Sequence, residues 1–223
     1  MSTAIESQIQ VRQSVVAAAA TLFRNQVMSH TGHANLSARL GEAEMLLTVS
    51  GMVRDLSPDG MARVKLDGTV LEGDLDPTNA EIVAMHTKVY LARPQVGGII
   101  HTHSPSLLAF AIANRPLPCR YEALLRFGQA AEVPVVPWAP RGSERSVDGI
   151  VDALQEHPAT QAVLLGNHGV LVLGKDPQAA AALVTVLEEA AAAELGASAL
   201  GGAKEFPAGA LDEVRAAMAR VRP

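Results

Sequence analysis

Two histidines at the end of one apolar run are the residues of this sequence best suited to chemistry. Residues 97–100 are apolar or glycine, and His101 and His103 follow with one residue between them. Side chains two residues apart in a strand point to the same side, so His101 and His103 can direct two imidazoles at one point. Ser104 and Pro105 are typical of a helix N-cap and of the first helical position. The pattern predicts a buried strand that ends in part of a divalent-metal site.

His168 is the best candidate for a third metal ligand. It lies in the segment Gly166-Asn167-His168-Gly169, between two apolar runs, where small residues leave room for a metal. Three imidazoles and an open position are typical of a catalytic Zn²⁺ site. Cys119 is the only cysteine, which excludes a cysteine-based cluster and leaves Mn²⁺, Co²⁺ and Fe²⁺ as alternatives to zinc. Of the other histidines, His33 could face the same pocket, and His86 is interpreted as a packing residue or as support for the site.

Composition restricts the class of protein. The 223 residues are 48% hydrophobic, which is enough for one domain with a substantial core, expected to span residues 1–223. The net charge of −5 argues against general nucleic-acid binding. No apolar run approaches the roughly 20 residues of a membrane span, and the N-terminus lacks the pattern of a signal peptide. We therefore expect a cytoplasmic protein with no nucleic-acid or membrane partner.

Periodicity and turn residues predict alternating helices and strands. The early strands are joined by connections too short for crossover helices, and we expect them to be antiparallel. A strand at 133–138 carries prolines typical of a sheet edge or a bulge. Helices are expected at 7–28, 78–92, 105–113, 144–156 and 176–194, and strands at 45–50, 63–71, 97–103, 133–138 and 162–174, the segments 63–71 and 162–174 being hairpins.

Glu81 has two interpretations. Asp76-Pro77 breaks the chain, and Thr78 and Glu81 then have the spacing of a capping box, in which Glu81 satisfies a backbone N–H at the start of a helix. The alternative is that Glu81 is a catalytic carboxylate.

These motifs resemble the class II aldolase/adducin family, to which fuculose-phosphate aldolase and metal-dependent decarboxylases belong. The resemblance covers most of the chain. It implies a three-layer α/β/α sandwich with a mostly antiparallel central sheet, and a divalent metal on His101, His103 and His168. It also implies a homotetramer with active sites between subunits. The motifs that carry it are the turn 32–37, the strand end 48–51, Arg93-Pro94 with the histidine pair that follows, and Asn167-His168-Gly169.

The resemblance also implies which residues bind an anionic small-molecule substrate. The family's catalytic glutamate opens the helix before the histidine pair, and Glu81 matches it with an offset of one position. Thr78 and Asn79 stand in place of two serines that help to hold a phosphate. Arg120 could receive a carboxylate in a bidentate pair, and Tyr121 could donate a proton. The remaining candidates for binding an anion are His33, Asn35, Ser50 and Gly51.

The implied chemistry is cleavage of a carbon–carbon bond, in which a metal acts as a Lewis acid. We expect decarboxylation of a hydroxy- or oxo-acid, including a hydroxylated aromatic acid, because the segment 77–81 is altered and arginines cluster at 120–126. The alternative is aldol cleavage of a ketose phosphate or a related compound, which needs a base and a proton donor such as Glu81 and Tyr121. Dehydration, epimerisation and a non-catalytic adducin-like module are minor alternatives.

Overall fold

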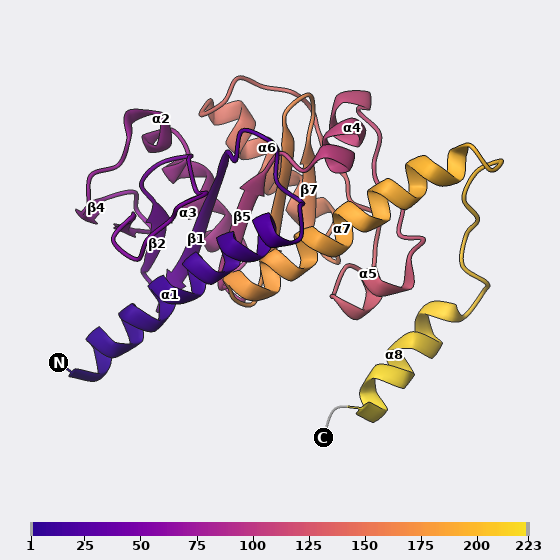
Figure 1. The fold of residues 1–223 in the computed structure, drawn as a ribbon, viewed down its shortest axis with the longest axis horizontal. Coiled ribbons are helices and arrows are strands. Elements are labelled where there is room, and N and C mark those ends of the chain that lie inside the picture. Colours follow the sequence, from indigo (N-terminus) through magenta and orange to yellow (C-terminus); the bar gives the residue numbers. More distant parts are fainter. Residues whose placement is uncertain (1, 222–223) are drawn as a thin grey trace.

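A computed structural model describes residues 2–221, with side chains described for residues 8–79 and 81–220 (Figure 1). The outermost residues of the expected domain, 1 and 222–223, lie outside the described part. Within the described part, no helix is both long enough and apolar enough to cross a membrane.

The centre of the structure is one sheet of eight strands in the order β4-β3-β2-β1-β5-β8-β7-β6. Every pair of neighbours is antiparallel except β6 and β7, so the expected mostly antiparallel sheet is confirmed. The proline-flanked strand β6 lies at an edge, as predicted. The strands are β1 Ala34–Leu40, β2 Glu44–Thr48, β3 Met61–Lys65, β4 Val70–Glu72, β5 Gly98–Thr102, β6 Val135–Val136, β7 Ala162–Leu165 and β8 Gly169–Gly174.

Helices cover both faces of this sheet, which confirms the three-layer sandwich. One face carries α1 (Ser2–Arg24), α4 (Pro105–Ala113) and α7 (Pro177–Ser198), and Figure 1 shows α1 and α7 side by side. The other face carries α3 (Val83–Ala92) and α6 (Glu144–Glu156).

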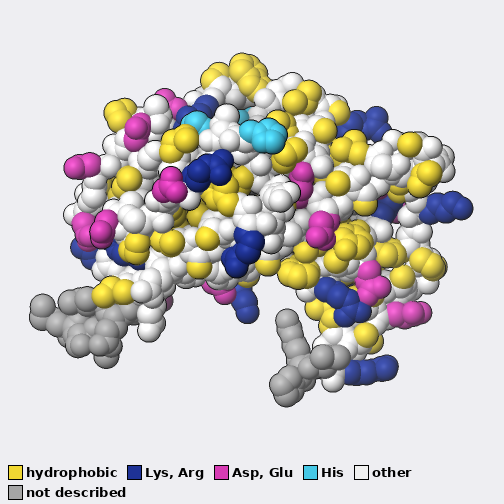
Figure 2. All heavy atoms as spheres, viewed as in Figure 1, with side chains coloured by type: hydrophobic (Ala, Val, Ile, Leu, Met, Phe, Trp, Pro, Cys, Tyr) yellow, Lys and Arg dark blue, Asp and Glu magenta, His cyan; other side chains and the backbone are white. Residues whose placement is uncertain are grey.

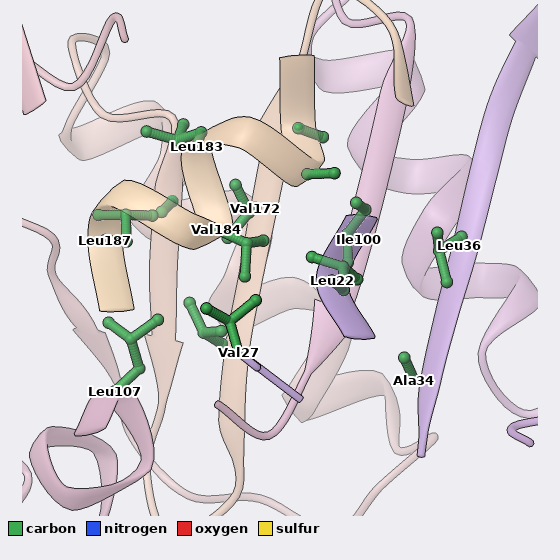
Figure 3. Packing of buried hydrophobic residues seen from close by; sticks show 14 of the residues in the cluster. Leu22, Val27, Ala34, Leu36, Ile100, Leu107, Val172, Leu183, Val184 and Leu187 are labelled. Atoms are coloured by element: carbon green, nitrogen blue, oxygen red, sulfur yellow. The ribbon is translucent and has the colours of Figure 1, made fainter. Parts of the chain in front are cut away.

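Two hydrophobic cores result because side chains of a strand alternate between the faces of a sheet. Ile100 of β5 packs with Leu22 of α1 and Val184 of α7 (Figure 3). Its neighbour Ile99 belongs to the second core, with Tyr90 of α3. Because aromatic residues are scarce, both cores consist mainly of Ala, Val, Leu and Ile.

Among the described residues, three further helices lie outside these layers: α2 (Pro77–Ala80), α5 (Glu122–Arg126) and α8 (Ala210–Val221). Helix α7 continues through Gly196, where we expected it to stop near 194. The cost of one helical glycine is only about 1 kcal/mol relative to alanine. The extensive packing of α7 on α1, α4 and the sheet stabilises the helix as a whole.

The predicted capping box of Thr78 and Glu81 is wrong. Asp76 is the N-cap, and its carboxylate accepts hydrogen bonds from the Thr78 backbone N–H at 2.8 Å and the Thr78 hydroxyl at 2.6 Å. Pro77 then takes the first helical position, and the N-cap lies two residues earlier than the predicted N-cap Thr78. Glu81 is instead the C-cap residue of α2, and α3 begins after its N-cap Ile82.

Candidate metal centre and substrate cavity

The histidine site forms where three central strands meet. Strand β5 is antiparallel to both β1 and β8, so its C-terminal end lies beside their N-terminal ends. His101 of β5 pairs with Asn35 of β1, and Thr102 pairs with Val170 of β8. His168 occupies the turn between β7 and β8, one residue before β8 begins. The topology therefore brings both parts of the expected ligand set to one end of the sheet.

The structure brings His101, His103 and His168 together, as predicted from their spacing and turn context. One ring nitrogen of each lies within 4.8 Å of the others. The ring centroids are 4.9 Å apart for His101 and His103, 4.7 Å for His101 and His168, and 5.2 Å for His103 and His168. His101 is buried and the other two are partly exposed.

The free nitrogens of this cluster suit a metal. His101 Nδ1 lies 3.0 Å from the carbonyl oxygen of Val170, which can only accept, so Nδ1 carries the proton and Nε2 keeps its lone pair. His103 Nε2 is buried and has no hydrogen-bond partner among the described residues. An orphaned buried nitrogen beside two further imidazoles fits a divalent ion, and an all-nitrogen set is usual for zinc.

Electrostatics keep the three imidazoles neutral, which is the form that binds a metal. Burial lowers the pKa of His103 to about 4, and the neighbouring His168 adds to the effect. Burial also lowers the pKa of His101 well below its usual range, and burial followed by the charge of Arg141 lowers that of His168.

Gly169 leaves the space in which these rings meet. A Cβ atom at this position would lie 2.6 Å from the carbonyl oxygen of Thr102 and 2.7 Å from Cδ2 of His103. Both distances are shorter than a real Cβ contact, so any larger residue must displace the strand or the ring.

One cavity beside the histidines is lined by four of the residues predicted to bind an anion. His33, Asn35, Gly51 and Asn79 line it together with the three histidines. Gly51 lies against His33, since a Cβ there would be 3.2 Å from the His33 ring. The buried Asn79 amide donates to the Thr48 carbonyl oxygen at 3.0 Å, which fixes α2 over the end of β2.

The hydroxyl groups predicted to bind an anion form hydrogen bonds with residues close to them in the sequence. The Thr78 hydroxyl donates to Asp76, and Ser50 Oγ accepts from the backbone N–H of Met52 at 3.1 Å. Neither Ser50 nor Thr78 lines the cavities beside the histidines.

Arg141 and Glu81 form an exposed wall beside the metal centre. Both line a cavity that also includes His101 and His168. Arg141 Nε lies 3.8 Å from Glu81 Oε2, and its Nη2 donates to the Thr78 carbonyl oxygen at 2.5 Å. The side chains are 44% and 52% exposed, so this ion pair is weak and both groups are accessible to a ligand. Figure 2 shows histidine side chains near basic ones on one face of the molecule.

Arg141 was not predicted as a site residue, because sequence alone gives it the appearance of a surface charge. The feature of the sequence that could have indicated a role for Arg141 is the glycine that follows it. Gly142 has a φ of +72°, and its approach to Glu81 is so close that a Cβ would lie 2.9 Å from the Glu81 Cβ. The loop therefore needs glycine in order to hold Arg141 against the wall.

Arg120 and Tyr121 lie in a different groove, away from the three histidines of the same chain. The Arg120 guanidinium forms ion pairs with Glu194 of α7, at 2.7 Å, and with Glu205. Tyr121 precedes α5 and is 41% exposed. Within one chain the structure therefore does not bring Arg120 or Tyr121 to the candidate site.

Comparisons with known proteins agree with this geometry. The sequence model of the family described as "Class II Aldolase and Adducin N-terminal domain" matches residues 13–195. The chain is 31% identical over 169 residues to 3-oxo-tetronate 4-phosphate decarboxylase of Escherichia coli (strain K12), covering 72% of this chain and 76% of that protein. It is 29% identical over 178 residues to methylthioribulose-1-phosphate dehydratase of Pseudomonas syringae pv. tomato, covering 75% of this chain and 85% of that protein.

The fold is also found among solved structures. An L-fuculose 1-phosphate aldolase superposes with a TM-score of 0.81 at 23% identity, covering 92% of this chain and 94% of that one. The match to the family covers every predicted metal ligand and the whole cavity around them. The chain therefore belongs to the class II aldolase/adducin family.

Proposed function

We propose that this chain is a divalent-metal-dependent carbon–carbon lyase that decarboxylates an anionic hydroxy- or oxo-acid. The observation that carries the proposal is the presence of three clustered imidazoles and the Arg141 guanidinium around two cavities that share His101, His168 and Arg141 as lining residues. A metal site next to a fixed cation suits a substrate with an oxygen to be polarised and an anionic group to be held. The decarboxylase relative, named for a phosphorylated 3-oxo acid, supports this substrate class.

A metal on His101, His103 and His168 would supply a Lewis acid for a substrate oxygen, and zinc is the metal that we propose. The chain's own groups would do the rest. Arg141, Asn35 and Asn79 would hold the anionic groups. Loss of carbon dioxide leaves a carbanion that needs a proton, and the Glu81 carboxyl lies in the cavity wall from which a proton can be delivered.

Aldol cleavage is the second candidate, and the position of Glu81 favours it. The carboxylate lines the same cavity as His101 and His168, where a base for a substrate hydroxyl would be needed. Tyr121 could act only from a neighbouring copy, in the cytoplasmic tetramer that we propose. The same copy would also present Arg120. Dehydration, which the other relative's name describes, would use the same metal and carboxylate.

A product screen tests the proposal. Purified protein loaded with Zn²⁺, Mn²⁺ or Co²⁺ is incubated with phosphorylated 3-oxo acids and with ketose 1-phosphates. Release of carbon dioxide, aldehyde and water-elimination products is followed in parallel. We expect the protein to release carbon dioxide from the 3-oxo acids faster than these acids lose it spontaneously, and we expect no acceleration after treatment with a chelator. Aldehyde release alone would replace the proposal by the aldolase candidate, and no product from either class would refute a lyase.

A further inference from the structure

A line of buried polar side chains runs from the substrate cavity into the layer between the sheet and α3. Asn35 and Ser37 belong to β1, and His86 and Tyr90 belong to α3. Asn35 is 5% exposed, and the other three are completely buried. Residues two apart on a strand share a face, and residues four apart on a helix share a side, so the two pairs meet across one interface.

Each member of the line lies within hydrogen-bonding distance of the next. Asn35 Oδ1 is 2.7 Å from His86 Nε2, and His86 Nδ1 is 2.7 Å from Ser37 Oγ. Ser37 Oγ is 2.9 Å from the Tyr90 hydroxyl. The guanidinium of Arg39 lies 4.7 Å from the centre of the Tyr90 ring and donates to the Tyr90 carbonyl oxygen at 2.7 Å, which fixes the far end.

The direction of these hydrogen bonds follows from the Tyr90 end. Burial raises the pKa of Tyr90 and lowers that of His86 to about 3, so both are neutral near pH 7. Among the described residues, Ser37 is the one hydrogen-bond partner of the Tyr90 hydroxyl. A buried phenol proton needs an acceptor, so Tyr90 donates to Ser37, and Ser37 must then donate to His86 Nδ1.

The tautomer of His86 is thereby determined. A neutral imidazole whose Nδ1 accepts carries its proton on Nε2, which donates to Asn35 Oδ1. The amide oxygen of Asn35 is thus occupied. Its Nδ2 amino group has no hydrogen-bond partner among the described residues, and Asn35 lines the cavity.

We propose that Tyr90, Ser37 and His86 are positioning residues that hold the Asn35 amide with its amino group toward the cavity, where it donates to an anionic oxygen of the substrate. The inference rests on the proposed function, in which Asn35 helps to bind an anion. If the amide were free to rotate, it would also present its oxygen, which repels an anion.

The tautomer can be read directly by nitrogen NMR of protein labelled with ¹⁵N-histidine, without any substrate. The His86 signals are assigned by their absence in His86→Gln. We expect a protonated Nε2 and an unprotonated Nδ1 in the zinc-loaded wild type. In Ser37→Ala the Nδ1 atom loses its donor, and its resonance should shift. A protonated Nδ1 in the wild type would overturn the inference.

Inorganic phosphate provides a binding probe that does not depend on turnover. Ser37→Ala and His86→Phe should weaken phosphate binding about tenfold, which corresponds to roughly 1.4 kcal/mol. His86→Gln should retain most of the affinity, because a glutamine amide can still donate to Asn35. Thr160→Val is the matched control, since it removes buried hydrogen bonds to Gln129 at another place in the fold.

The outcomes separate the two proposals. Equal phosphate affinity in Ser37→Ala and Thr160→Val, or no phosphate binding by the wild type, would overturn the positioning role. The expected tautomer and phosphate affinities in a protein that turns over no substrate would refute the proposed function alone.

Discussion

His101 and Val170 are joined by a hydrogen bond from the imidazole Nδ1 to the backbone carbonyl oxygen, at 3.0 Å across β5 and β8. The acceptor is a main-chain atom, so no substitution of Val170 removes it. This bond fixes both the tautomer and the orientation of the ring, which leaves Nε2 directed at the other two histidines. The most buried ligand of the proposed metal centre is therefore set by the register of the sheet.

His103→Ala should remove the metal and leave the fold intact. His103 Nε2 makes no hydrogen bond within the described protein, so its loss leaves no new unsatisfied partner. We expect metal affinity to fall by at least about a hundredfold, with activity lost. Elemental analysis and circular dichroism test this, with the exposed His30→Ala as control. Full metal content in His103→Ala would contradict the ligand assignment.

Glu81→Gln distinguishes the two candidate reactions. The change keeps the shape of the side chain and removes its proton-transfer ability, while its weak pairing with Arg141 at 3.8 Å contributes little to stability. An aldolase should lose about a hundredfold or more in kcat, and a decarboxylase less. Complete loss of carbon dioxide release would show that Glu81 is indispensable in decarboxylation too.

Arg141→Ala should raise KM for an anionic substrate by about tenfold or more, because a hydrogen bond to a charged group contributes roughly 1.5–3 kcal/mol. Arg141→Lys should restore only part of the loss, since an ammonium cannot form a bidentate pair. Steady-state kinetics measure both. Arg145→Ala, which removes an exposed charge from α6, is the control, and an equal rise in KM there would exclude a specific role for Arg141.

Gly169→Ala should disturb the metal centre and the strand together. The added Cβ would meet the Thr102 carbonyl oxygen at 2.6 Å, and overpacking of this kind costs about 1–3 kcal/mol. Urea unfolding and metal analysis measure the two effects. Gly196→Ala is the comparison, because a Cβ added at this position of α7 would have no atom within 4 Å. Alanine is more stable than glycine inside a helix, so this change should stabilise the protein by about 0.5–1 kcal/mol. Equal effects at both positions would contradict the steric argument.

The stability of the metal-free protein should rise with pH between about 3 and 6.5. Burial lowers the pKa of His86 to about 3 in the folded state, against about 6.5 in an unfolded chain. The unfolded state therefore binds more protons in this window, so stability falls as pH is lowered through it. Urea midpoints from pH 7.5 to 4.5 test the slope. His86→Gln should make it shallower, and an unchanged slope would locate the effect elsewhere.

Local patterns were enough to predict most elements and the cluster of three histidines. The structure contains the strand end predicted from the i,i+2 spacing of His101 and His103, and the predicted turn that holds His168. Both could be predicted because each depends on a few neighbouring residues. The start of the helix near Glu81 was mispredicted because Asp76-Pro77 and Thr78-Glu81 are competing start signals, and the former is used.

Contacts between distant segments could not be predicted in the same way. The sequence suggests that Arg120 binds substrate, because its partners Glu194 and Glu205 are far away along the chain. In the structure these two carboxylates form ion pairs with the Arg120 guanidinium. His86 lies on a mostly apolar helix, and its partner Asn35 is identified only by the packing of α3 on β1. Such pairings depend on tertiary structure, for which one sequence carries no local signal.

The residues around the metal centre come from two kinds of segment. His101 and Asn35 belong to paired central strands, whereas Arg141 and Glu81 lie on exposed connections. Exchanging the residues of 77–81 and 139–143 other than Asn79 and Gly142 should therefore change which substrate is admitted while the metal centre remains assembled. For protein engineering, these two segments are the natural place to diversify, and the strand ends should be left unchanged.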